Sequence, residues 1–506
     1  MQQHLKSVWL QTSQAPSAHL LISDLEADII VIGAGITGLT TAYLLTKQGK
    51  KVIVLESDRI GSGVTAFSTG HLTASIDADY SFISSRIGKD TAKQVATSMQ
   101  EAISKIEEIC REENIDCGFV RLSAYQYTED NKQVKELADE AQASEEAGLE
   151  VRLGDQIPLD FPVKKMFEIK NQAEFNALQF IHGLANCIVR DGGQIFENAH
   201  VTDVDDSEPC VVTTDTGFQL RARQVVLATH TPIQFNITQA EMLPYRSYVL
   251  ALKLNGKQIP KGLYWDMLEH YHYIRTYEYN GENYLIVGGE DHKVGKDKFD
   301  ENEAFDRLEN YARPKFGNLA ISHRWSAQHF MSADGLPYIG KSPFGKNKFI
   351  ATGFAGDGLT FGVVSAVLLT DLLTGKTHPW ADLYSPSRAN IIASARDWAE
   401  ENLTTMYRYV KDRLTTDAGD VVEVPRGEGR IIRMKGQQVA VYRDEQDQVH
   451  AHSAVCTHMG CIVQWNDSEK SWDCPCHGAR FDAQGQVITG PAVKALTPFT
   501  IEMQAK

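Results

Sequence analysis

Residues 28–56, DIIVIGAGITGLTTAYLLTKQGKKVIVLE, form the stretch that decides the fold. Residues 28–33 carry a continuous apolar run that ends in glycine, and apolar residues then recur at helical spacing as far as Gly49. A second apolar run, 51–56, follows at once. Apolar runs joined by a helical segment are typical of buried parallel strands. The segment therefore predicts a strand, a tight turn, a helix and a second strand.

The predicted turn carries three glycines at the spacing Gly33-x-Gly35-x-x-Gly38. The first glycine permits the turn, the second lets the backbone approach a pyrophosphate, and the third lets the helix lie close to the sheet. The positive end of the helix then faces the phosphates. Glu56, at the end of the second strand, can accept hydrogen bonds from ribose hydroxyls. We therefore expect a bound dinucleotide, with an ordinary tight turn as the alternative.

Length and composition set the class of protein. The 506 residues suggest about three domains, or two large ones. Hydrophobic residues make up 42% and charged residues 23%, which is ordinary globular composition. The formal net charge of -16 would repel phosphate backbones and anionic lipid, so we expect no nucleic-acid partner. We also expect no membrane span and a cytoplasmic location, with peripheral docking on a membrane left open.

The remaining pattern predicts three regions. Residues 90–113 read as an amphipathic helix, and segments 246–254 and 284–290 alternate like antiparallel strands. Residues 385–415 are polar and helix-prone, and short strands with frequent glycine follow them. These features predict an α/β module with an antiparallel insertion and a small all-β domain. The expected boundaries are given by three ranges: 1–384, a helical linker 385–415, and 416–506.

The sequence after Glu56, ESDRIGSGVTAFSTGH at 56–71, resembles the superfamily of D-amino acid oxidase, glycine oxidase and sarcosine oxidase. The resemblance spans about residues 25 to 375 and implies that the dinucleotide is FAD. It also implies a Rossmann-like FAD-binding domain with an inserted antiparallel α+β substrate domain. Beyond Gly33, Gly35, Gly38 and Glu56, the residues that it places near FAD are Ser62, Thr65, Ser68, Val201, Ala228, Thr229, Gly353, Gly356, Gly358 and Thr360.

The closing motif at 353–360, GFAGDGLT, also has a physical use. Its glycines can bring backbone N–H groups to a flat ligand, and the apolar helix that begins near Leu359 points its positive end there. A reduced flavin is anionic around N1 and C2=O. The helix end should therefore stabilise the reduced form.

A second motif lies in the C-terminal region, where Cys456-x-His458 and Cys474-x-x-His477 follow one another. Two thiolates and two neutral imidazoles at this spacing match the ligand set of a Rieske 2Fe-2S cluster. A mononuclear zinc ion is the alternative, because cysteine and histidine also suit zinc. The sequence therefore predicts an all-β Rieske domain at the C-terminus.

This region resembles the Rieske proteins of cytochrome bc complexes, in which cysteines at the positions of Cys461 and Cys476 form a disulfide between the two cluster loops. The resemblance implies the same pair here. Those proteins carry a serine and a tyrosine where this chain has Ala479 and Phe481. Because both donors to the cluster are missing, we expect a potential in the lower part of the Rieske range, roughly -150 to +300 mV.

Three residues are candidates for the substrate site. The oxidase resemblance places a carboxylate-binding arginine at Arg324, although Trp325 stands where the family has proline, so a structural ion pair is the alternative. Tyr273, with Arg275 beside it, lies on a predicted inserted strand, and His71 lies in the flavin-proximal segment. Exposed aromatic packing and a structural histidine are the respective alternatives.

These motifs predict an FAD-dependent dehydrogenase. It would oxidise a C–N bond of a small amine or amino acid by hydride transfer to FAD, and electrons would leave through the cluster to an external one-electron acceptor. Electron flow in the opposite direction and a non-catalytic redox sensor are the alternatives.

Overall fold

The computed structural model describes residues 6–13, 16, 19–233, 237–294, 301–343, 345–388 and 424–501. The predicted linker, 385–415, lies outside these residues from 389 onward, as does the predicted domain start at 416. The linker and the domain boundaries therefore stay predictions.

The first sheet has nine strands and a parallel centre, as the opening sequence predicts. Its path runs β1-β8-β3-β2-β11-β10-β9, and β18 pairs with β11 and with β17. The strands are β1 (His19–Leu20), β2 (Leu25–Ile32), β3 (Val52–Leu55), β8 (Gln194–Glu197), β9 (Val201–Asp205), β10 (Cys210–Thr214), β11 (Gln219–Leu227), β17 (Tyr338–Lys341) and β18 (Lys348–Thr352).

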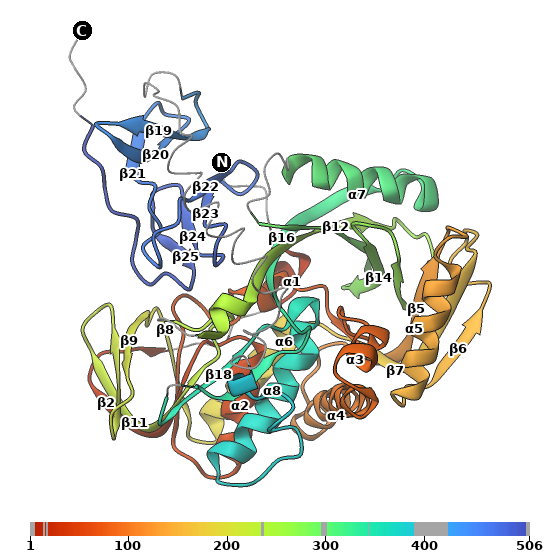
Figure 1. The fold of residues 1–506 in the computed structure, drawn as a ribbon, viewed down its shortest axis with the longest axis horizontal. Helices are drawn as coiled ribbons and strands as arrows, with labels where there is room; N and C mark the ends of the chain where they lie inside the picture. The colour runs from red at the N-terminus through yellow and green to blue at the C-terminus, as the bar shows by residue number, and fades with distance from the viewer. Residues whose placement is uncertain are drawn as a thin grey trace.

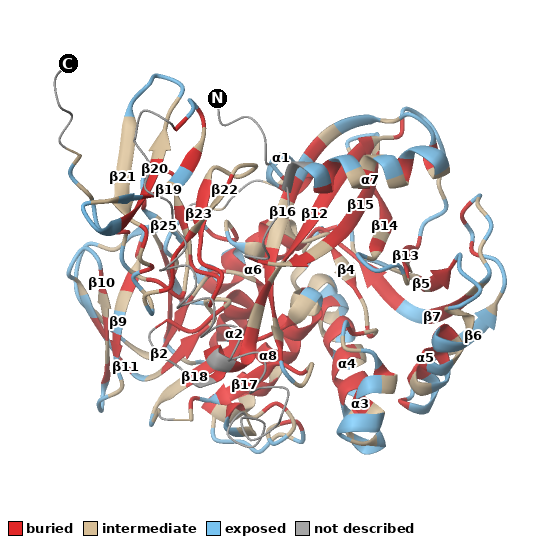
Figure 2. Ribbon diagram, turned by 45° about the horizontal axis from the view of Figure 1, so that its top comes forward, coloured by how far each residue is buried: buried red, intermediate tan, exposed pale blue. Residues whose placement is uncertain are grey.

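Both faces of this sheet are buried. Ile29 and Val31 of β2 belong to one apolar cluster, whereas Ile30 and Ile32 belong to another. Helices α2 (Ile36–Lys47) and α8 (Gly358–Leu373) pack against each other, and both are largely buried in Figure 2. The other helices are α1 (Val8–Thr12), α3 (Tyr80–Arg86), α4 (Lys89–Glu113), α5 (Val134–Glu146), α6 (Ala177–Arg190) and α7 (Glu301–Phe316).

Helix α8 has the length and composition of a membrane span. Within the described residues, 355–373 is the one segment that meets this test, with a mean hydropathy of 1.4. Two thirds of it, 67%, is buried inside the protein. The central helix of a soluble protein has the same properties, and the packing of α8 against α2 and α4 explains its apolar sequence.

The second sheet is mainly antiparallel and follows the path β16-β12-β15-β14-β13-β5-β7-β4, with β6 beside β7. Helix α7 packs on β12 and β15, and covers one face of the sheet (Figure 1). The strands are β4 (His71–Leu72), β5 (Val120–Thr128), β6 (Val151–Gly154), β7 (Lys165–Glu174), β12 (Met242–Lys253), β13 (Leu263–Asp266), β14 (His272–Tyr279), β15 (Glu282–Lys293) and β16 (Ala320–Ser332).

The C-terminal domain, blue in Figure 1, is built from two small antiparallel sheets beside β16. The predicted all-β character of this region is confirmed. Its strands are β19 (Gly429–Met434), β20 (Gln437–Arg443), β21 (Val449–Ser453), β22 (Gln464–Asn466), β23 (Ser471–Asp473), β24 (Arg480–Asp482) and β25 (Val487–Thr489).

Candidate functional site

A cavity of about 980 Å³ extends from the carboxyl ends of the first sheet's parallel strands to the inner face of the second sheet. The loops after β2, β3, β11 and β18 all line it. This edge of an open α/β sheet is where such folds bind nucleotides. The C-terminal domain lines the cavity as well, through residues 487–490, 492 and 493.

Two glycines of the first motif make close contacts that exclude a side chain. Gly33 has φ +104°, and a Cβ atom there would lie 2.5 Å from the carbonyl oxygen of Ala228. A Cβ on Gly38 would lie 1.9 Å from the carbonyl oxygen of Gly33. Gly38 therefore lets α2 approach the loop, as expected. Gly38 itself does not line the cavity.

Glu56 lies at the end of β3 and is held by the loop beside it. Its Oε2 accepts a hydrogen bond from the backbone N–H of Ala34 (2.8 Å), and its Oε1 accepts one from the N–H of Asp58 (3.1 Å). The carboxylate lines the cavity next to the glycine loop. Its position fits the predicted ribose-binding role.

Most of the residues assigned to FAD line this cavity. They are Gly33, Gly35, Glu56, Thr65, Ser68, Val201, Ala228, Thr229, Gly356, Gly358 and Thr360. Three of the assigned residues, Gly38, Ser62 and Gly353, do not belong to the lining. The Ser62 hydroxyl accepts a hydrogen bond from the backbone N–H of Arg59 (3.3 Å) within its own turn. A Cβ atom on Gly353 would lie 3.4 Å from the sulfur of Met242.

His71 lines the cavity as a neutral imidazole. Burial, with the nearby charge of Arg275, lowers the pKa of His71 to about 3. Its Nδ1 lies 2.9 Å from Thr69 Oγ1, whereas its Nε2 is buried and has no hydrogen-bond partner among the described residues. A ligand atom in the cavity can supply that partner, and the glycine cradle leaves room for a flat ring. The residues present therefore fit FAD.

Tyr273 also faces the cavity, but Arg275 does not. The Tyr273 hydroxyl lies 2.9 Å from Ser247 Oγ, and its ring meets His71 edge-on at 5.7 Å. The buried guanidinium of Arg275 donates instead to the carbonyl oxygens of Thr69 (3.0 Å) and Gly70 (2.7 Å). Arg275 thus supports the backbone that carries His71.

The structure places Arg324 outside the cavity, whereas the sequence analysis expects it to bind a substrate carboxylate. Its partners across the sheet, Leu250 on β12 and then Val287 on β15, belong to the apolar cluster beneath α7. Arg324 is exposed on that face, with its guanidinium 5.8 Å from the Phe305 ring. Because side chains alternate along a strand, the neighbouring Trp325 points inward. Arg324 therefore does not line the cavity and cannot hold a substrate there.

The inner face of the second sheet presents a row of side chains that the sequence analysis did not assign. Gln126 on β5 pairs with Trp265 on β13, which pairs with Tyr273 on β14. Directly opposed residues share a face, and all three line the cavity. Tyr273 in turn lies opposite Gly288, where a Cβ would fall 2.1 Å from its ring.

Acidic side chains are the other feature that the sequence analysis missed. Asp77 Oδ2 accepts a hydrogen bond from the N–H of Gly356 (2.6 Å), and Asp357 Oδ2 accepts one from the N–H of Asp77 (2.9 Å). Burial and the charges of Glu140, Asp77 and Glu136 raise the pKa of Asp79 to about 8. Positions 77 and 357 come together only in the fold, so sequence spacing gives no signal for them.

The predicted cluster ligands lie on two loops of similar geometry. The N–H of Gly460 donates to the carbonyl of Cys456, and the N–H of Gly478 donates to the carbonyl of Cys474, both at 3.0 Å. Both glycines have positive φ, +81° and +69°. The two loops therefore present a cysteine and a histidine each from matching turns.

The predicted ligands meet in two pairs, the two histidines and the two cysteines. The rings of His458 and His477 lie 5.0 Å apart between centroids, and the Nδ1 atom of each is buried without a hydrogen-bond partner in the described structure. A hydrogen bond from the Cys474 thiol lowers the pKa of Cys456. Two facing thiols and two unpartnered imidazole nitrogens fit a 2Fe-2S cluster.

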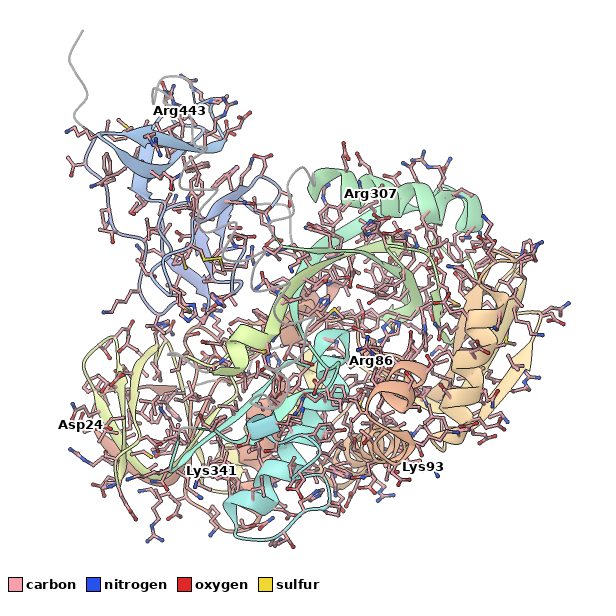
Figure 3. The ribbon with its side chains drawn as sticks, in the orientation of Figure 1. Asp24, Arg86, Lys93, Arg307, Lys341 and Arg443 are labelled. Atoms are coloured by element: carbon pink, nitrogen blue, oxygen red, sulfur yellow. A yellow bond between two sulfur atoms is a disulfide. The ribbon has the colours of Figure 1, made fainter. Side chains whose placement is uncertain are left out.

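The structure joins Cys461 and Cys476 in a disulfide, the yellow bond in the C-terminal domain of Figure 3. The sulfurs of Cys461, Cys474 and Cys476 lie within 4.8 Å of one another. The disulfide therefore links the two cluster loops next to a predicted ligand.

A buried ionic network holds the C-terminal domain on the second sheet. Arg246 of β12, which is 1% exposed, contacts Glu469 and donates to Asp473 Oδ2 (3.1 Å). Arg480 binds the same two carboxylates from within the C-terminal domain. Although burial opposes ionisation, Arg246 and Arg480 lower the pKa of Glu469 to about 2. Glu469 is therefore charged at neutral pH and lies between two guanidinium groups.

The chain belongs to the DAO family of FAD-dependent oxidoreductases, whose model matches residues 28–372, and it carries a Rieske [2Fe-2S] domain over residues 415–500. It is 33% identical over 502 residues to a putative Rieske 2Fe-2S iron-sulfur protein, YhfW, of Bacillus subtilis (strain 168), with 98% of each chain covered. It is 25% identical to gamma-glutamylputrescine oxidoreductase of Escherichia coli (strain K12), with 70% of this chain and 85% of the relative covered.

A solved structure shows the same fold for the first module. Glycine oxidase from Geobacillus kaustophilus superposes with a TM-score of 0.61 at 18% identity, with 72% of this chain and 99% of that chain covered. These comparisons confirm the predicted fold class and both cofactors, FAD and a 2Fe-2S cluster. The zinc alternative is therefore discarded.

Proposed function

We propose that the protein is an amine or amino-acid dehydrogenase that breaks the α-C–H bond of a substrate C–N unit and passes the electrons out through its Rieske domain. The observation that carries this proposal is the contact between the two modules. The C-terminal domain lines the same cavity as the predicted FAD-binding glycines, through residues 487–490, 492 and 493.

A continuous path of contacts connects the two sites. Thr229 lines the cavity and precedes His230, whose Nε2 lies 3.1 Å from the carbonyl oxygen of Gln328. The side-chain amide of Gln328 then donates to the carbonyl oxygen of Gly478 over 2.8 Å. Gly478 directly follows the predicted ligand His477. This path supports transfer within one chain.

The reaction balances with a named acceptor. When bound, FAD would take a hydride from the substrate while the substrate nitrogen loses a proton, and the cluster would pass the two electrons singly to an external one-electron acceptor as the proton of the hydride is released to solvent. The residues of this chain orient the amine. Neutral His71 and the Tyr273 hydroxyl offer uncharged polar contacts at the inner face.

We place the reaction in the cytoplasm, and the net charge of -16 supports a soluble location away from anionic lipid.

Anaerobic stopped-flow mixing with amines and amino acids tests this function. The proposal expects the flavin absorbance to bleach first and the cluster absorbance to follow in the same molecule. A flavin that bleaches beside a cluster that stays oxidised would contradict the electron path. Failure of every amine and amino acid to bleach the flavin would contradict the dehydrogenase assignment.

Electron flow in the opposite direction is the second candidate, and the cluster surroundings favour it. Ala479 and Phe481 are fully buried, at 0% exposure each, and neither has a hydroxyl to donate to the cluster. A low cluster potential would follow. Redox titration separates the two directions, because a cluster well below the flavin would favour flow from the cluster to the flavin.

A further inference from the structure

We propose that the substrate is a diamine or polyamine, with at least two positively charged nitrogens and no carboxylate. This inference rests on the proposed function and names the substrate class of the same cavity. One nitrogen would carry the C–H bond that is oxidised, and the other would be bound by carboxylates of the cavity wall. The reaction is the one proposed for the dehydrogenase: FAD would take the hydride, and the electrons would leave to an external one-electron acceptor.

The charge of the cavity is the first observation. Besides Glu56 and Asp58 at the nucleotide end, its wall carries six carboxylates: Asp77, Asp79, Glu136, Asp266, Asp291 and Asp357. The Oδ2 atom of Asp266 is already paired with Nδ1 of His272, 3.0 Å away. None of the described residues that line the cavity is a lysine or an arginine. A substrate carboxylate would therefore meet no lysine or arginine, whereas an ammonium group would favour the ionised form of the carboxyls it faces.

The carboxylates form a band along the wall. Asp77 lies near both Asp79 and Asp291, because its charge raises the pKa of each. Asp77 and Asp79 are open to the cavity, and Asp291 has a buried Oδ1 without a hydrogen-bond partner among the described residues. His329 lies 3.8 Å from Asp291, but burial lowers the pKa of His329 to about 4, so it supplies no charge at neutral pH. An extended polycation matches this band.

Gln126 is the second, independent observation. Its side chain is only 8% exposed, lines the cavity, and holds an Oε1 atom with no hydrogen-bond partner in the described structure. A buried amide oxygen without a donor indicates that a ligand supplies one. Its neighbour on the same face, Trp265, adds an aromatic ring, and aromatic rings attract cations. An ammonium group satisfies both side chains.

The test uses the oxidised FAD-loaded protein and follows the flavin absorbance, so that it does not depend on turnover. Hexamethonium is the probe, because its two quaternary nitrogens have no lone pair and cannot be oxidised as amines are. Tetramethylammonium is the monocation control, and benzoate is the carboxylate control. We expect hexamethonium to bind at least about tenfold more tightly than tetramethylammonium, since a second paired charge at a protected site contributes that much. Benzoate should not perturb the flavin.

Two variants assign the binding to the acidic band. At pH 9, where both carboxyls are ionised, Asp79→Asn and Asp291→Asn should each weaken hexamethonium at least about tenfold. Asp155→Asn removes a carboxylate that is 75% exposed and paired with Lys165, and should leave the affinity unchanged. FAD content and circular dichroism show whether each variant is folded. Three results would each overturn the inference. Hexamethonium could bind no more tightly than tetramethylammonium, benzoate could bind instead of hexamethonium, or both Asp variants could leave the affinity for hexamethonium unchanged.

The same materials separate this inference from the proposed function. If hexamethonium binds through Asp79 and Asp291 but no amine bleaches the flavin, the dehydrogenase assignment fails and the cation site stands. If amino acids bleach the flavin and 1,4-diaminobutane does not, the dehydrogenase stands and the substrate class is wrong.

Discussion

The side-chain amide of Gln328 donates a hydrogen bond to the main-chain oxygen of Gly478 over 2.8 Å, and this bond ties the wall of the flavin cavity to the loop that follows His477. A Cβ on Gly478 would lie 2.6 Å from the same amide nitrogen, so the contact uses the glycine at this position. Gln328 therefore contacts both the predicted flavin cavity and the loop that carries the predicted cluster ligand His477.

Replacing Gln328 tests whether that bond matters for electron transfer. Gln328→Leu removes the hydrogen bond that links the two sites in this path, so the step from flavin to cluster should slow severalfold. Stopped-flow traces should show this on the cluster signal, with flavin bleaching by substrate much less affected. Gln484→Leu, an exposed site in the same domain, is the control. Equal slowing of both signals would indicate a general structural effect instead.

The Arg246 network should hold the two modules together. Arg246→Met leaves Glu469 and Asp473 buried with one cation fewer, and removing one partner of a buried pair costs about 3–5 kcal/mol. We expect easier undocking in urea, followed by proteolysis between the modules. Arg426→Met disrupts a pair that is 62% and 46% exposed and should cost about 0–1 kcal/mol. Identical urea curves for both variants would exclude the proposed role.

FAD retention should depend on Gly38, although it does not line the cavity. Gly38→Ala places a methyl group 1.9 Å from the Gly33 oxygen, so the loop or α2 must move and FAD should be lost on purification. Gln48→Ala changes an exposed residue just after the C-terminal end of the same helix and should keep FAD. The flavin-to-protein absorbance ratio measures both. A fully loaded Gly38→Ala protein would show that α2 can shift at no cost.

Binding of hexamethonium should strengthen as pH rises from about 6 to 9. The pKa of Asp79 is raised to about 8 and that of Asp291 to about 7, so both carboxyls gain charge across this range. Asp77, Glu136 and Glu140 face Asp79 and act in the same direction. Tyr271, Ser247, Glu290 and His329 surround Asp291, and none of them adds a cation above pH 6. An affinity independent of pH would exclude these carboxyls as the binding groups.

The sequence predicts local geometry better than it predicts which faces meet. The Gly33 turn and the spacing of His458 and His477 are short-range patterns, and the structure arranges them as expected. Arg324 was misplaced because a one-residue change of register moves a strand residue to the opposite face. The three-residue row from Gln126 to Tyr273 depends on the pairing of distant strands, which spacing along the chain does not encode.

The contact between the modules could not be predicted either. Arg246 and Glu469 are separated by 223 positions, and each reads in the sequence as an ordinary surface charge. Only the docked arrangement buries them together. The acidic band has the same origin, since Asp77, Asp291 and Asp357 come from three separate segments.

The central claim is that electrons pass between FAD and the cluster of one chain. Its most direct test is electron paramagnetic resonance on the loaded protein, frozen after anaerobic addition of one equivalent of 1,4-diaminobutane. We expect a reduced Rieske signal whose intensity rises as the flavin bleaches, and which Gln328→Leu delays. A fully bleached flavin with no Rieske signal at any time would contradict it.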